Sequence, residues 1–220
     1  MQKFATPAPI TVVLDVPAGR VRLIAADRAD TAVEVLPADA AKGRDVKAAE
    51  QTAVTCADGV LRIEAPAKNQ LLGASGSVEV TVQVPAGSRV EGTSAGAEFR
   101  AVGRLGDVAF TGVHGRAKVD EAGSVRLTAL DADVEIGRLG GPAEIATERG
   151  AIRITEAAGG TVVLRTRSGD ISVGAAAGVS AALDAKTGHG RVSNALKNDG
   201  TTGLDIRATT DQGDITARSL

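Results

Sequence analysis

Thr166-Arg-Ser-Gly169-Asp170-Ile171-Ser-Val173 is the stretch that organises the sequence. Its pattern is Ser or Thr, any two residues, Gly or Ala, any residue, and then two apolar residues separated by one position. Thr147 to Ile154 and Thr210 to Ala217 match it closely, and Thr187 to Asn194 matches it more loosely. The small residue that marks each copy recurs at intervals of 18, 17, 18, 19, 21 and 23 residues: Ala97, Gly115, Ala132, Gly150, Gly169, Gly190 and Gly213. This period predicts a repeat architecture.

Each repeat contains two apolar pairs separated by glycine-rich turns. Ile171 and Val173 form one pair, and Val162 and Leu164 form the other. Because strand side chains alternate between faces, both members of a pair point inward and a residue between them, such as Ser172, points outward. A unit this small cannot bury its apolar face alone, so copies must stack. The sequence therefore predicts an all-β fold, a β-solenoid with coils of roughly 18 to 20 residues, whose seven coils span about 30 Å.

Two columns of side chains are expected where coils stack in chain order. The residue after each marker gives a column with no two like charges adjacent: Glu98, Arg116, Asp133, Ala151, Asp170, Arg191 and Asp214. Such alternation avoids repulsion between successive coils. A second column predicts a ladder of stacked hydroxyl groups: Thr147, Thr166, Thr187 and Thr210.

Residues 1–90 predict a less regular β region that continues the solenoid of residues 91–220 or caps it, within one structural unit. Alternating apolar residues on both sides of Pro17-Ala-Gly19 indicate a hairpin there. A second hairpin is predicted at Asp58-Gly59. The remaining expectations are a strand over 32–36, a loop with one helical turn over 37–50, a loop over 66–76 and a strand over 78–84.

The composition limits the kind of core that the protein can form and the classes of partner that it can bind. Three phenylalanines are the only aromatic residues, which predicts a thin, evenly layered core. The net charge is −2, with acidic and basic residues mixed throughout, and no basic stripe indicates nucleic-acid binding. No apolar stretch resembles a signal peptide or membrane span, so we expect a cytoplasmic protein without membrane insertion. Cys56 is the single cysteine, which excludes an intramolecular disulfide and fits a reducing compartment.

At its Gly-Asp-Ile-x-Val repeats the sequence resembles the bacterial putative-adhesin family of β-strand-repeat domains, which is largely of unknown function. The resemblance runs from the Pro17-Ala-Gly19 turn to Gly213-Asp-Ile215-Thr and so covers most of the chain. It implies a β-helical stack with a less regular N-terminal part. It supplies no catalytic residues.

Catalytic, cofactor and metal sites are not expected. Asp131 and Asp133 would point to the same face of a strand and could mimic the acid pair of a glycosidase or lyase, but solvated turn acids are far commoner. Calcium needs six to eight converging oxygen ligands. Arg116 and Arg191 would place cations in the aspartate column instead, which disfavours a calcium site.

The two histidines form a weak candidate surface site. His114 and Arg116 flank one marker glycine, and His189 and Arg191 flank another. They could bind an anion or form a pH-sensitive contact. In a regular stack, however, the two pairs would lie four coils apart, roughly 19 Å. That separation favours ordinary solvated turn residues.

We expect a non-enzymatic β-solenoid scaffold that binds protein partners, including a second copy of itself. The last repeat leaves only three residues after its strand, which predicts an uncovered self-association edge: Asp214, Ile215, Thr216, Ala217 and Arg218. Unpaired edges recruit another chain unless a charge such as Arg218 blocks them. Pairing would give a dimer if the contact is two-fold and a filament if it runs head to tail.

The alternative is an envelope- or carbohydrate-associated adhesin-like binding protein, or a carbohydrate-active enzyme on a β-helix. Such proteins commonly present a contiguous acidic or aromatic groove, and aromatic platforms are prominent in sugar binding. No such groove is visible in the sequence, which lacks tryptophan and tyrosine.

Overall fold

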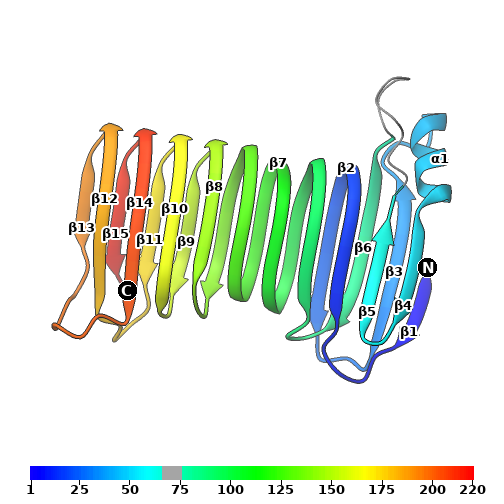
Figure 1. The fold of residues 1–220 in the computed structure, drawn as a ribbon, viewed down its shortest axis with the longest axis horizontal. Helices are drawn as coiled ribbons and strands as arrows, with labels where there is room; N and C mark the ends of the chain where they lie inside the picture. Colours follow the sequence, from blue (N-terminus) through cyan, green and yellow to red (C-terminus); the bar gives the residue numbers. More distant parts are fainter. Residues whose placement is uncertain (66–75) are drawn as a thin grey trace.

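The computed structural model describes residues 1–65 and 76–220, which form an elongated stack of β-strands with a short helix near the N-terminal end (Figure 1). The predicted all-β solenoid is confirmed, because successive coils pair side by side in parallel. The predicted loop over 66–76 lies, except for Gly76, outside the described residues.

The N-terminal part contains short strands and the helix. Its elements are β1 (Gln2–Ala5), β2 (Thr11–Ala26), β3 (Asp30–Pro37), α1 (Gly43–Gln51), β4 (Ala53–Ala57), β5 (Val60–Glu64) and β6 (Val78–Pro85). The next strand, β7 (Arg89–Leu139), runs without interruption for 51 residues because it winds through several coils. The remaining strands are β8 (Ala143–Arg149), β9 (Ile152–Ala157), β10 (Gly160–Ser168), β11 (Ile171–Ala175), β12 (Ala181–His189), β13 (Val192–Ala195), β14 (Leu204–Gln212) and β15 (Ile215–Ser219).

Two layers of parallel strands enclose the core of the C-terminal half. We call the layer that contains β8, β10, β14 and β12 layer A, and the layer that contains β9, β11, β15 and β13 layer B. The inward-facing apolar pairs stack in register, as the alternation predicted. In layer A, Leu164 lies between Ile145 and Ala208, and in layer B, Ile171 lies between Ile152 and Ile215. These six side chains are at most 1% exposed.

The coils do not stack in chain order. In layer A, β14 lies between β10 and β12, and in layer B, β15 lies between β11 and β13. After β11 the chain therefore skips one position, builds the β12–β13 coil, and returns through residues 196–203 to fill the gap with β14 and β15 (Figure 1). The longer marker intervals of 21 and 23 residues around Gly190 supply the chain length for these two crossings.

The marker glycines are required by the turns between layers. Gly169 has φ +153° and Gly213 has φ +149°, and a Cβ at either position would collide with the backbone carbonyl of the neighbouring coil. Glycine is the residue that tolerates both the backbone conformation and the close approach.

The threonine column stacks in register, but the hydroxyl groups do not bond to one another. Thr210 and Thr187 are aligned neighbours. The Thr210 hydroxyl donates to the Gly169 carbonyl at 3.0 Å, and the Thr187 hydroxyl donates to the Gly213 carbonyl at 2.9 Å. These two threonines, and Thr166 through the Gly150 carbonyl at 3.1 Å, tie their own coil to the glycine turn of the adjacent coil. The Thr147 hydroxyl instead donates to the Arg149 carbonyl of its own coil at 2.8 Å.

The hairpin predicted at Pro17-Ala-Gly19 is wrong. β2 continues through this turn, and both of its halves pair in parallel with β7. The turn therefore carries the chain from one layer to the other, and β2 forms a complete coil. A hairpin and a coil turn share the same local apolar alternation, so the sequence pattern did not distinguish them.

The other N-terminal predictions fit the structure. β4 and β5 form the hairpin predicted at Asp58-Gly59, where both turn residues have positive φ, as a type I′ turn requires. The predicted helical turn is α1. Its buried Asp45 accepts a hydrogen bond from the Ser77 N–H at 3.0 Å, which fixes the start of β6.

The two ends of the stack differ in construction. At the N-terminal end, β1 and β3 are antiparallel to their neighbours, β4 is antiparallel to β5, and α1 packs against β3 and β6. At the other end, β12 and β13 are both parallel to the strands they meet.

Candidate functional site

The predicted self-association edge is not an edge. Ile215 is aligned with Ile171 on one side and with Val192 on the other, and Ala217 lies between Val173 and Asn194. The stretch Asp214, Ile215, Thr216, Ala217 and Arg218 is therefore inside the stack. The prediction failed because it assumed that the last coil in the chain is also the last coil in space.

The open end of the solenoid is formed by β12 and β13. Among the described residues, β12 pairs with β14 alone and β13 with β15 alone, so one side of each strand has no strand partner. Val192, which is aligned with the buried Ile215, is 47% exposed. Leu183 and Ala185 also face the core but are only half-buried, because no further coil covers them.

One residue in the sequence marks this coil as terminal. Asn194 occupies an inward-facing column that otherwise contains Ile154, Val173 and Ala217. An amide in the middle of the stack would be buried without a defined partner, which is costly. At the open end Asn194 is exposed to solvent. The loose match of Thr187 to Asn194 to the repeat pattern was the available signal.

Backbone groups along β12 alternate between the neighbouring strand and the open side. The Leu204 N–H of β14 donates to the Ser180 carbonyl at 3.2 Å, just before β12 begins. The backbone groups of even-numbered residues of β12 therefore point toward β14, and those of odd-numbered residues point to the open side. Leu183 and Ala185 therefore direct their N–H and C=O groups to the open side, whereas Asp184 and Lys186 direct theirs to β14. The Asp184 and Lys186 side chains lie on the outer face of layer A and are exposed.

The predicted alternation of charge in the marker column is wrong, because Asp170 and Asp214 lie on adjacent coils. Their carboxylates serve the backbone instead. Asp170 Oδ1 accepts the Asp214 N–H at 2.8 Å, and Asp214 Oδ1 accepts the Arg191 N–H at 2.8 Å. Arg191 Nη2 also lies 3.3 Å from Asp214 Oδ2. The Arg191 N–H, aided by its guanidinium, lowers the pKa of Asp214 below its ordinary value.

Asp214→Asn is expected to remove part of the acid sensitivity of the fold. Because the folded-state pKa of Asp214 is lowered, the carboxylate contributes stability above the pKa of the unfolded chain and loses it as pH falls through the folded-state pKa. The amide oxygen of Asn can still accept the Arg191 N–H. Thermal melts from about pH 7 to about pH 2 should show a less stable variant near neutrality and convergence in acid. A Tm difference that is constant with pH would contradict this.

The two histidine-arginine pairs are not brought together. His114 and Arg116 lie on β7, whereas His189 and Arg191 lie at the turn between β12 and β13. Insertion of the β14–β15 coil adds one step to the four expected between them, for a separation of about 24 Å. These residues therefore do not form a common site.

Asp131 and Asp133 also have structural partners. Arg149 Nη2 lies 2.9 Å from Asp131 Oδ2. Asp133 Oδ1 accepts the Ala151 N–H at 2.9 Å. Both acids join neighbouring coils, so their geometry does not support the acid-pair interpretation.

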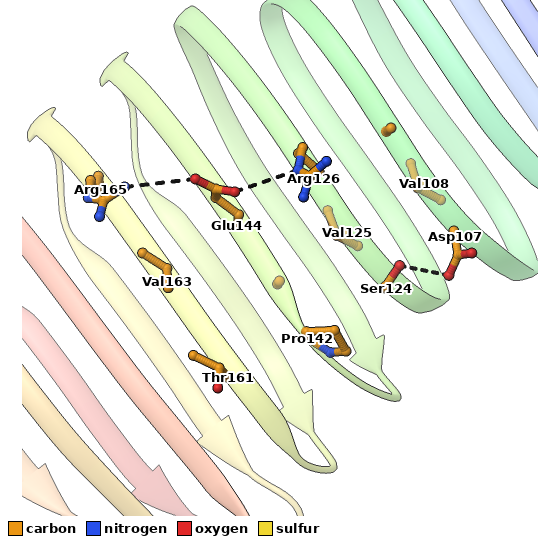
Figure 2. A pocket seen from close by; sticks show the side chains of 12 residues that line it. Asp107, Val108, Ser124, Val125, Arg126, Pro142, Glu144, Thr161, Val163 and Arg165 are labelled. Carbon is orange, nitrogen blue, oxygen red and sulfur yellow. Dashed lines mark hydrogen bonds and ion pairs between the residues drawn. The ribbon is translucent and has the colours of Figure 1, made fainter.

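A shallow depression of about 530 Å³ lies on the outer face of layer A (Figure 2). Its charged side chains are paired with one another: Arg126 lies 3.5 Å and Arg165 3.9 Å from Glu144. The Ser124 hydroxyl donates to Asp107 at 2.7 Å. Because these side chains already bond to one another, the depression offers few hydrogen-bonding or charged groups to a ligand.

In the described ranges, no group of three or more His, Cys, Asp or Glu side chains is arranged to hold a metal ion. No helix among these residues is long and apolar enough to span a membrane.

Comparison with known proteins identifies the family. Residues 11–219 match the family model described as Toastrack DUF4097. Solved structures to which the chain is similar include proteins described as a putative adhesin from Bacteroides fragilis, with 12% identity and a TM-score of 0.44, and a putative adhesin from Parabacteroides distasonis, with 15% identity and a TM-score of 0.44. Each alignment covers 98% of this chain and 95% of the other. None of the curated proteins compared with the chain matches it. Because the family model spans nearly all of the sequence, the chain belongs to the Toastrack DUF4097 family.

Proposed function

We propose that this protein is a non-enzymatic scaffold that binds protein partners by strand addition at its open end. The observation that carries the proposal is the lack of a strand partner on one side of both β12 and β13 among the described residues. An added strand supplies main-chain hydrogen bonds for affinity, and side-chain contacts supply specificity. Leu183 and Val192 provide apolar surface for such contacts.

The outer faces of the two layers are better suited to stabilising the stack of coils than to binding a partner. Their charges form ion pairs between neighbouring coils, such as Arg89 with Asp107, Lys118 with Glu135 and Arg138 with Glu156. Exposed pairs of this kind contribute little each, but repeated along the stack they favour the correct register. The open end, in contrast, presents backbone donors and acceptors directed away from the stack.

Strand addition can be tested with a labelled synthetic peptide of residues 204–219, a coil that the solenoid already stacks on β12 and β13. Its binding is measured by fluorescence anisotropy with three proteins: the wild type, Ala185→Pro and Ala185→Ser. The proline removes an N–H that points to the open side, whereas serine changes the same side chain and keeps this N–H.

We expect saturable binding by the wild type and Ala185→Ser, and loss of binding by Ala185→Pro. Thermal melts establish that each variant is folded. Equal binding by the proline and serine variants, or no binding by any of the proteins, would contradict strand addition at this end.

A further inference from the structure

We propose that the open end pairs with the open end of a second copy, giving a two-fold dimer in which β12 lies antiparallel to the partner's β12. This inference rests on the proposed function and specifies the partner. It differs from the filament that a head-to-tail contact would produce.

The unlike ends of the stack favour a two-fold contact. A head-to-tail contact would place β12 and β13 against the antiparallel strands β1 and β4 of the next copy, near α1. A two-fold axis perpendicular to the layers instead joins two identical ends. It sets each β12 against the other β12 and each β13 against the other β13, so both layers continue across the contact.

The backbone restricts the registers available to the β12 pair. Leu183 and Ala185 direct their hydrogen-bonding groups to the open side, as do the other odd-numbered residues of this strand up to Thr187. A contact centred on a residue pairs odd-numbered residues with odd-numbered ones. Registers centred on Asp184, Ala185 or Lys186 therefore satisfy the backbone. These registers differ in which side chains lie opposite each other across the contact.

Charge selects the register centred on Ala185. A contact centred on Asp184 sets that carboxylate against its own copy, and a contact centred on Lys186 does the same with two ammonium groups. The contact centred on Ala185 places each Asp184 opposite the partner's Lys186. Ala185 is also the midpoint of β12, Ala181–His189, so this register aligns the centres of the two strands and sets Leu183 opposite the partner's Thr187. The Ala181 N–H already donates to the Lys197 carbonyl at 3.0 Å, so the pairing runs over 183–187.

The same arrangement accounts for the apolar surface at the open end. Leu183 and Ala185 face the core but are half-buried, and Val192 is 47% exposed. A second open end would cover these side chains as the next coil does elsewhere in the stack. Lys186, which would otherwise discourage edge pairing as an exposed edge lysine does, gains a partner in Asp184.

A charge-exchange experiment tests the register. Sedimentation velocity over a range of concentrations is used to measure dimerisation of the wild type, Asp184→Lys, Lys186→Asp, and the variant carrying both changes. Each single change creates two like-charge pairs across the two-fold axis. We expect each to weaken dimerisation about tenfold or more.

Two combinations are expected to restore dimerisation. In the double variant the charges are exchanged and each pair is again opposite in sign. An equimolar mixture of the two single variants should form a heterodimer, because one chain then carries two lysines and the other two acids at these positions. A merely structural effect of the substitutions would not be rescued by mixing.

Three outcomes would overturn the two-fold dimer: a wild type that stays monomeric at all concentrations, a dimer that does not respond to the charge changes, or filaments in electron micrographs. A monomer that still binds the peptide of residues 204–219 would retain strand addition with a different partner. A dimer that Ala185→Pro abolishes but the charge changes do not affect would retain the open end and exclude this register.

Discussion

Ile171→Asp is expected to destabilise the protein by about 4 kcal/mol or more, or to prevent folding. Ile171 is 1% exposed and is stacked between Ile152 and Ile215 in layer B. A carboxylate there would be buried among aliphatic side chains, with no cation beside it in the column. Chemical denaturation followed by circular dichroism measures the loss.

The neighbouring residue provides the matched control. Asp170→Asn should change stability little, because the asparagine side-chain oxygen can still accept the Asp214 N–H that Asp170 accepts at 2.8 Å. A large loss for Asp170→Asn together with a small loss for Ile171→Asp would mean that the assignment of inward and outward faces is wrong.

Removal of residues 204–220 is expected to release the β12–β13 coil as well. β12 is paired with β14 and β13 with β15, so the truncation takes away the partners of both strands. Hydrogen exchange measured by mass spectrometry should show loss of amide protection across 181–195 in the chain of residues 1–203. A solenoid stacked in chain order would keep this protection, because β12 and β13 would then pair with β10 and β11.

A second truncation makes the test quantitative. If the β12–β13 coil depends on β14 and β15, the chains of residues 1–203 and 1–180 should have similar Tm values, since both end in the coil of β10 and β11. A longer chain that is clearly more stable and protected over 181–195 would show that this coil can dock directly on β10 and β11. Asn194 would then be aligned with Val173, in an otherwise apolar column.

The sequence predicted that the solenoid has an open end but not which coil forms it. The edge prediction at Asp214–Arg218 was wrong in position, although an open end does exist at β12 and β13. Asn194 in an apolar column and the long intervals around Gly190 were signals of the true end. The histidine-arginine pairs stay apart, because a shared local pattern on different coils does not bring residues together.

The sequence by itself determined the coil: glycine at the turn, Ile171 and Val173 inward, Asp170 outward, and about 18 residues per repeat. These features depend on alternation of side chains and on backbone conformation, which are local properties. Only the tertiary structure decided the order of the coils and therefore which residues form the open end. Every coil presents nearly the same apolar columns to its neighbours, so local pattern fits several orders equally well. The observed order buries the more apolar β14–β15 coil on both sides and leaves the coil with Asn194 at the end.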